Sequence, residues 1–175
     1  MKKALFISMV LSLNLIWAQF QTPVTLSAKV DDTARSGEVA NVFVNASMDA
    51  EWWIYALRDQ GQGPVASNVS VISDVIDKAG MVLEEEPTER YDEGFLTTTK
   101  FHQGGALFTA PILLKSDLSP GIYNLEVSVL FQVCNATLCY PPSVEKLIVP
   151  IEIESGPVRD DHTEMIMAPT VVGGS

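Results

Sequence analysis

The sequence has few residues of the types that build metal centres and nucleotide sites. Its 175 residues include only two histidines and two cysteines. No HxH pair and no repeated CxxC pair is present, so a zinc site is not expected. The sequence also lacks a phosphate-binding glycine loop, a dinucleotide fingerprint and a recognisable Ser-His-Asp arrangement. We therefore expect neither a cofactor nor a metal ion.

Basic residues are also scarce. Lysine and arginine together number 11 against 22 aspartate and glutamate residues, which gives a formal net charge of −11 at pH 7. An acidic surface repels phosphate backbones and anionic lipid headgroups. Nucleic acid is therefore excluded as an expected partner.

Apart from its first residues, the chain lacks a long hydrophobic run. Lys2 and Lys3 precede an apolar stretch from Ala4 to Trp17, and the small residue Ala18 follows. This layout is typical of a secretory signal peptide, and the run is shorter than the roughly 20 residues of a spanning helix. We predict a signal peptide over residues 1–18, cleaved near Ala18, and export to an oxidising compartment.

Helical periodicity is absent as well, and a period of two takes its place. In Gly121–Val133 the odd positions from Tyr123 onward are all apolar, whereas most even positions are polar. Such alternation is typical of a strand with one face on a core and the other in water. Nine strands are predicted: Val24–Val30, Glu38–Ser47, Trp52–Leu57, Asn68–Ser73, Gly80–Glu84, Leu96–Phe101, Gly105–Leu114, Gly121–Val133 and Val144–Glu154.

Many short strands without intervening helices predict an all-β fold, an immunoglobulin-like antiparallel β-sandwich over residues 19–154. Two segments are expected to be loops: the Gly/Pro-containing stretch 58–66 and the acidic stretch 84–94. Residues 155–175 lose all periodicity and are predicted to be a linker or tail, which favours a chain that continues in a longer protein.

The two cysteines, Cys134 and Cys139, lie in the segment Phe131–Pro142, which reads FQVCNATLCYPP. In an exported protein they are expected to pair. Closing so short a loop stabilises a fold by only about 2 kcal/mol, against about 4.7 kcal/mol for a loop of 100 residues. A passive structural disulfide and a reversible, redox-active one both remain open at this point. The small gain in stability favours the redox-active disulfide.

The segment FQVCNATLCYPP resembles the active-site strand of the N-terminal periplasmic domain of the thiol:disulfide interchange protein DsbD family. That family has an aromatic-Gln pair before the first cysteine and a Pro-Pro pair after the second. Trp52–Leu57 followed by Gly63-Pro64 resembles its aromatic strand and turn, and Arg90–Phe95 resembles the acidic pair and aromatic residue of its cap loop. The similarity extends over about residues 21–154.

The resemblance implies a periplasmic protein-disulfide reductase module that passes electrons through Cys134 and Cys139. Its implied partners are thioredoxin-like periplasmic proteins of disulfide isomerisation and cytochrome c maturation, with a membrane-embedded electron donor in cis or in trans. Cys139 would form the mixed disulfide and Cys134 would resolve it. Since proline at 141 and 142 keeps the chain extended, Cys139 is expected to face outward and Cys134 to be sheltered.

The same resemblance assigns roles to four further side chains. Asp92 and Glu93 are expected to tune the thiol pKa or to accept a proton. Phe95 is expected to act as the cap aromatic, and Tyr55 to approach the cysteines from a neighbouring strand. If the chain continues past Ser175 into a membrane domain, the module would be tethered to the inner membrane.

Two alternatives compete with this interpretation. The first is a non-catalytic immunoglobulin-like binding module with a structural disulfide. The second is a copper protein, since cupredoxins are also β-sandwiches with Cys, His and Met ligands. Copper is disfavoured because His102 lies far upstream of the cysteines and no histidine closely follows Cys139. A metal site at His162, Met165 and Met167 is disfavoured as well.

Overall fold

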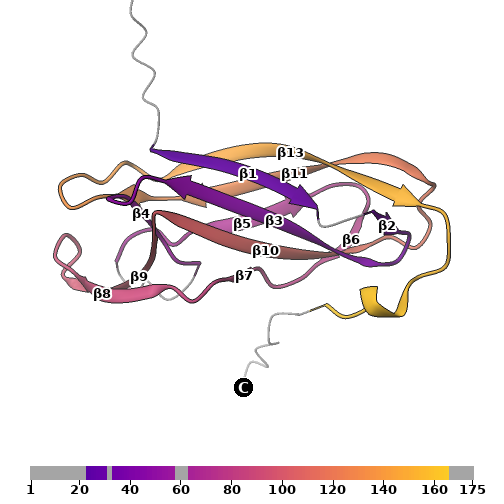
Figure 1. Cartoon of the computed structure of the whole chain (residues 1–175), viewed down its shortest axis with the longest axis horizontal. Coiled ribbons are helices and arrows are strands. Elements are labelled where there is room, and N and C mark those ends of the chain that lie inside the picture. Colours follow the sequence, from indigo (N-terminus) through magenta and orange to yellow (C-terminus); the bar gives the residue numbers. More distant parts are fainter. Residues whose placement is uncertain (1–22, 31–32, 58–62, 166–175) are drawn as a thin grey trace, which may run out of the picture.

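The computed structural model describes residues 23–30, 33–57 and 63–165 (Figure 1). The predicted signal peptide, part of the loop 58–66 and the end of the predicted tail lie outside the described residues. Within them, no helix is long and apolar enough to cross a bilayer. A single 3-10 turn, η1 (Asp160–His162), is the one helical element of the described chain.

Two sheets form an immunoglobulin-like β-sandwich, which confirms the predicted fold class. The first sheet has the order β1-β3-β10-β6, and β7 also pairs with β10. The second has the order β2-β13-β11-β5. All pairs are antiparallel except β2 with β13. The strands are β1 (Val24–Val30), β3 (Val39–Met48), β10 (Gly105–Leu114), β6 (Ile76–Ala79), β7 (Leu83–Glu84), β2 (Ala34–Arg35), β13 (Ser143–Glu154), β11 (Gly121–Phe131) and β5 (Asn68–Ile72).

The core lies between these two sheets and follows the alternation seen in the sequence. From Leu125 to Phe131, every second residue of β11 is fully buried, as the period-two pattern predicts. The facing sheet contributes small and large apolar side chains from β3 and β10. The most completely buried of these are Val42, Val44, Ala46, Phe108 and Ile112.

A third, smaller sheet extends one end of the sandwich. Its order is β12-β4-β9-β8, with β12 (Val133–Cys134), β4 (Trp53–Tyr55), β9 (Thr97–Gln103) and β8 (Thr88–Asp92). The chain passes from β9 into β10 at Gly104, whose φ of 74° is easily adopted by glycine. It passes from β11 into β12 across Gln132, so the predicted strand Gly121–Val133 is interrupted there. The small sheet is thus an extension of strands that already form the core.

One local prediction was wrong, and two short strands were not predicted. The acidic stretch 84–94 was expected to be a loop, but Thr88–Asp92 forms β8, the edge strand that pairs with β9. Its side chains are mostly exposed and polar, so no apolar alternation marks it in the sequence. The short strands β2 and β6 were also not expected, because two to four residues are too few to show a period.

The segment after β13 contacts the sandwich at the end opposite the small sheet (Figure 1). Glu38, which is fully buried, accepts hydrogen bonds from the backbone N–H of Arg159 at 2.7 Å and from its Nη2 at 2.6 Å. The backbone N–H of Arg35 also donates to this carboxylate at 2.9 Å. The predicted linker 155–175 therefore starts with residues that supply the partner of a buried carboxylate, in a partly buried ion pair.

The ion pair has a consequence for pH dependence. Hydrogen bonds from Arg159 and Arg35 outweigh burial and lower the pKa of Glu38 from 4.5 to about 2. A carboxyl whose pKa is lower in the folded state stabilises the fold above its unfolded pKa, and this contribution is lost as the pH falls. For Glu38 the loss spans the range from about 4.5 down to about 2.

We predict that Glu38→Gln makes the free energy of unfolding less dependent on pH between 4.5 and 2 than in the wild type. Arg159→Met, which leaves the carboxylate buried without its counter-charge, is expected to lower the melting temperature at pH 7 by several degrees. Thermal unfolding followed by circular dichroism measures both. A control, Lys146→Met, removes a surface cation that pairs with Glu126, and is expected to change little. If Arg159→Met and Lys146→Met changed the melting temperature equally at pH 7, the prediction would be contradicted.

Candidate functional site

The two cysteines form a disulfide between directly opposed residues of a tight hairpin. Cys134 and Cys139 form an isolated antiparallel bridge, and their Cα atoms are 4.1 Å apart. The backbone N–H of Tyr140 donates to the carbonyl of Val133, and that of Asn135 donates to the carbonyl of Leu138. The disulfide thus closes a four-residue loop that is already held by backbone hydrogen bonds.

Asn135 stabilises this loop through its side chain. Its Oδ1 accepts hydrogen bonds from the backbone N–H groups of Thr137 at 2.9 Å and Leu138 at 2.8 Å, and from the Thr137 hydroxyl at 3.1 Å. This is the turn-forming behaviour for which asparagine is favoured. The loop therefore holds the sulfurs in a defined place.

The register of the small sheet places the site on one face. Residues directly opposite one another in antiparallel strands share a face. Trp53 lies opposite Cys134 and Gln103, whereas Ile54 lies opposite Val133 and His102. Ile54 and Val133 belong to the sandwich core, and Trp53 belongs with Cys134 to a separate buried cluster.

That second cluster brings together aromatic residues from neighbouring strands. It consists of Trp53, Tyr55, Phe101 and Cys134, with Phe95 packed against it. The rings of Trp53 and Phe101 are 5.9 Å apart. Cys134 is fully buried in this cluster, which agrees with the shelter expected for it, while Cys139 is exposed. The two cysteines of one disulfide therefore differ in exposure to solvent.

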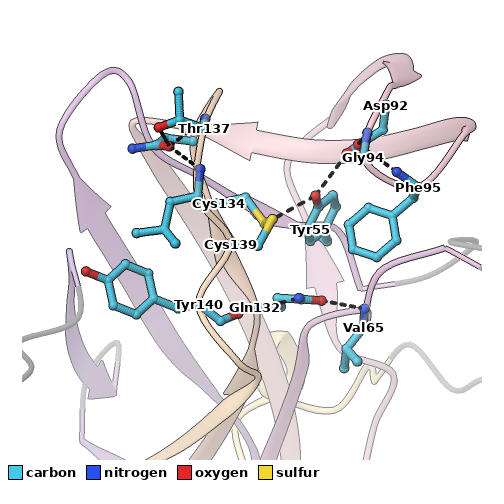
Figure 2. The surroundings of a disulfide bond; sticks show 12 residues. Tyr55, Val65, Asp92, Gly94, Phe95, Gln132, Cys134, Thr137, Cys139 and Tyr140 are labelled. Carbon is cyan, nitrogen blue, oxygen red and sulfur yellow. Dashed lines mark hydrogen bonds between the residues drawn. A yellow bond between two sulfur atoms is a disulfide. The ribbon is translucent and has the colours of Figure 1, made fainter.

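Tyr55 links the buried sulfur to a carboxylate. Its hydroxyl donates to Asp92 Oδ2 at 2.9 Å and also faces Cys134 Sγ at 3.4 Å (Figure 2). Burial raises the pKa of Tyr55 to about 12, and the hydrogen bond with Asp92 acts in the same direction. The tyrosine therefore stays protonated at neutral pH and remains a hydrogen-bond donor.

Asp92 also shapes the turn between β8 and β9. Its Oδ1 accepts hydrogen bonds from the backbone N–H groups of Gly94 at 2.9 Å and Phe95 at 3.3 Å. The Phe95 ring then packs edge-on against Tyr55, with ring centroids 5.9 Å apart. Leu96 ends the turn with a φ of 54°, which is uncommon for a residue with a side chain, and it is 75% exposed. One carboxylate thus positions both the tyrosine and the aromatic residue over it.

A cavity of about 450 Å³ lies between the turn and the cysteine loop. Tyr55, Asp92 and Glu93 line it on one side, and residues 135–139 line it on the other. Glu93 is exposed at its rim. The structure therefore brings five of the six expected site residues to one cavity and the cluster below it, and the sixth, Phe95, packs on that cluster.

Sequence reasoning missed two residues of this face. The guanidinium carbon of Arg90 lies 4.1 Å from the ring centroids of both Trp53 and Phe101, and Arg90 and Trp53 line the cavity. In the sequence, Arg90 is only the first residue of the stretch Arg90–Phe95, and Trp53 is one of three aromatic residues in the predicted strand Trp52–Leu57. Reading Thr88–Asp92 as a strand would have put Arg90 on the face of Asp92, two residues away.

The histidines lie elsewhere. His102 is buried on the opposite face of the small sheet, where its Nε2 is 3.0 Å from Glu84 Oε2. The same carboxylate oxygen accepts the backbone N–H of Leu57 at 2.8 Å. Among the described residues, no three His, Cys, Asp or Glu side chains gather as a metal site would require.

The domain is thus an immunoglobulin-like sandwich with a cross-strand disulfide beside a cavity. The family model for the thiol:disulfide interchange protein DsbD, N-terminal, matches residues 21–150. The chain belongs to this family and is a thiol–disulfide interchange module. No curated protein matches the sequence.

Solved structures show similar folds at low identity. The reduced N-terminal domain of DsbD from Neisseria meningitidis is 16% identical, with a TM-score of 0.43 over 70% of this chain and 88% of that chain. The N-terminal periplasmic domain of ScsB from Proteus mirabilis is 18% identical, with a TM-score of 0.47 over 74% and 45%. The CssB subunit of an Escherichia coli colonization factor is 13% identical, with a TM-score of 0.42 over 75% and 97%. The family membership rests on the family match and not on these likenesses.

We predict that Phe95→Ala accelerates oxidation of the reduced cysteine pair by a small oxidant several-fold. The reason is that the substitution removes the ring packed on the cluster around Cys134. Leu96→Ala is the matched control, because it removes an exposed apolar side chain from the same turn. Timed alkylation of the remaining free thiols measures both rates. Equal rates for Phe95→Ala and the wild type would show that this ring does not protect the sulfurs.

Proposed function

We propose that the chain is a periplasmic protein-disulfide reductase module that delivers electrons to thioredoxin-like partners. One observation carries the proposal: in a member of this family, the disulfide joins an exposed cysteine that lines a cavity, Cys139, to a fully buried one, Cys134. Exchange needs an accessible sulfur for the partner and a second sulfur that only its neighbour can reach.

The reaction has two balanced steps. In the dithiol form, the Cys139 thiolate attacks one sulfur of the partner's disulfide, forms a mixed disulfide and expels the partner's first thiolate. The Cys134 thiolate then attacks Cys139 Sγ and expels the second partner thiolate, which takes up a proton. The chain loses two electrons and regains its disulfide, and the partner becomes a dithiol.

The groups beside Cys134 are suited to the second step. Cys134 must lose its proton before it attacks, and its Sγ lies 3.4 Å from the Tyr55 hydroxyl, which donates to Asp92. Asp92 is in a position to draw the proton away through Tyr55, and a nearby negative charge disfavours an early thiolate. Glu93, at the rim, would act on Cys139 in the same way. These roles for Asp92 and Glu93 belong to the proposal.

Membership of this family also supports a proposal for the source of the electrons. We infer that a membrane-embedded donor, in cis or in trans, returns two electrons to Cys134 and Cys139. The partners would serve disulfide isomerisation and cytochrome c maturation. The alternative is a binding module whose disulfide is structural, and two experiments separate it from the carrier.

The first experiment is reduction without denaturant. We expect a dithiol reductant and a reduced thioredoxin-like protein to open the Cys134–Cys139 disulfide in the folded chain, because Cys139 is exposed. The loss of stability is expected to be about 2 kcal/mol, since the closed loop is short. Mass-tagging of thiols counts the opened cysteines, and circular dichroism checks the fold. A disulfide that resists reduction until the chain unfolds would favour the structural alternative.

The second experiment assigns the two sulfurs. Cys134→Ala leaves Cys139 able to attack but removes the thiol that releases the partner, so mixed disulfides with an oxidised thioredoxin-like protein should accumulate. Cys139→Ala should abolish both the trapped complex and electron transfer. Non-reducing gels detect the complexes. Trapping by the Cys139 variant instead would reverse the roles, and trapping by neither would contradict the carrier function.

A further inference from the structure

Arg90 is a cation held in place by aromatic rings rather than by acids. It lies on β8 opposite Thr99, on the same face as Asp92 two residues later. Its guanidinium carbon is 4.1 Å from the centroids of both Trp53 and Phe101, whose rings are tilted by 56°. Contact with two ring faces fixes the plane of the guanidinium group through cation–π attraction.

The two acids within two residues of Arg90, Glu89 and Asp92, are engaged with other groups. Glu89 Oε2 lies 4.0 Å from Lys100 Nζ. Asp92 accepts hydrogen bonds from the Tyr55 hydroxyl and from two backbone N–H groups of the turn. Among the described residues, no hydrogen bond or ion pair joins Arg90 to an acceptor. Its flat set of N–H donors is therefore available to a ligand.

Arg90 also shares the cavity with the exposed cysteine. Of the described residues that line this cavity, it is the only lysine or arginine, and Cys139 lies on the opposite wall. A group bound by Arg90 would thus sit beside the sulfur that meets a partner. Because the chain as a whole carries a net charge of −11, long-range attraction does not select acidic partners, and any preference must be local.

We propose that Arg90 recognises a side-chain carboxylate that a protein partner presents next to its reacting disulfide. This inference rests on the proposed function and adds a specificity-determining residue to it. A guanidinium group binds a carboxylate through two parallel N–H···O hydrogen bonds, and one that is already held loses little freedom on binding. Asp92 and Glu93 repel the same carboxylate, but they are unchanged in the variants that test Arg90.

The test uses two cyclic peptide disulfides with blocked termini that differ only in having Glu or Gln beside one cysteine. Reduction of each by the dithiol form of the full chain is followed under second-order conditions. We expect the wild type to react about fivefold faster with the Glu peptide, the size of an exposed ion pair. For Arg90→Gln, the ratio of the rate with the Glu peptide to the rate with the Gln peptide should fall to one or below. Arg90→Lys should keep part of the preference, since the charge remains but the planar fork is lost.

Lys146→Gln is the matched control, because it removes one cation from β13, where Lys146 pairs with Glu126. Its ratio should equal that of the wild type. If the wild-type dithiol reduces neither peptide, the proposed function fails, and the inference with it. If the wild type reduces both at equal rates, or if Arg90→Gln keeps the ratio or slows both peptides alike, the inference alone is overturned.

Discussion

The site depends on a single constraint: β4 is buried on both faces and must hold its register. Ile54 points into the sandwich core and is fully buried, while Trp53 and Tyr55 on either side point into the aromatic cluster. A slip of one residue would exchange the two faces, because strand side chains alternate. Such a slip would bury the Tyr55 hydroxyl among aliphatic side chains away from Asp92. The packing of the core thus fixes the geometry of the redox site.

The small sheet also explains why a site of this kind needs the whole domain. Cys134 comes from β12, Tyr55 from β4, and Asp92 and Phe101 from the consecutive strands β8 and β9, so three separate parts of the sequence meet at the site. Each strand is short, but β9 and β12 continue from β10 and β11 of the sandwich. The long strands stabilise the sheet, and the short ones carry the chemistry. The reactive groups therefore lie in the small sheet at one end of the sandwich, and the core between the two main sheets stays apolar.

Much of this could be predicted from the sequence. The alternation of β11 gave its buried face, and the cysteine spacing with the following prolines indicated the reactive hairpin. Tyr55, Asp92, Glu93 and Phe95 came from resemblance, since their proximity results from strand pairing that a local pattern does not show. Arg90 was missed because an exposed arginine in an acidic stretch looks like a solvated surface residue. The contact of Glu38 with Arg159 joins positions 121 residues apart, which no periodicity reveals.

The contact of Tyr55 with two neighbours has a consequence that follows from counting hydrogens. A hydroxyl has one hydrogen, and the carboxylate of Asp92 is a better acceptor for it than a sulfur. In the disulfide form, Cys134 has no hydrogen, and the one hydrogen of Tyr55 is donated to Asp92. The sulfur therefore faces the lone pairs of the tyrosine oxygen. Reduction adds a hydrogen to Cys134, which can then donate to that oxygen. In the dithiol form, a continuous chain of hydrogen bonds would run from Cys134 through Tyr55 to Asp92. This chain would stabilise the reduced form of the cysteine pair, which is the form that donates electrons.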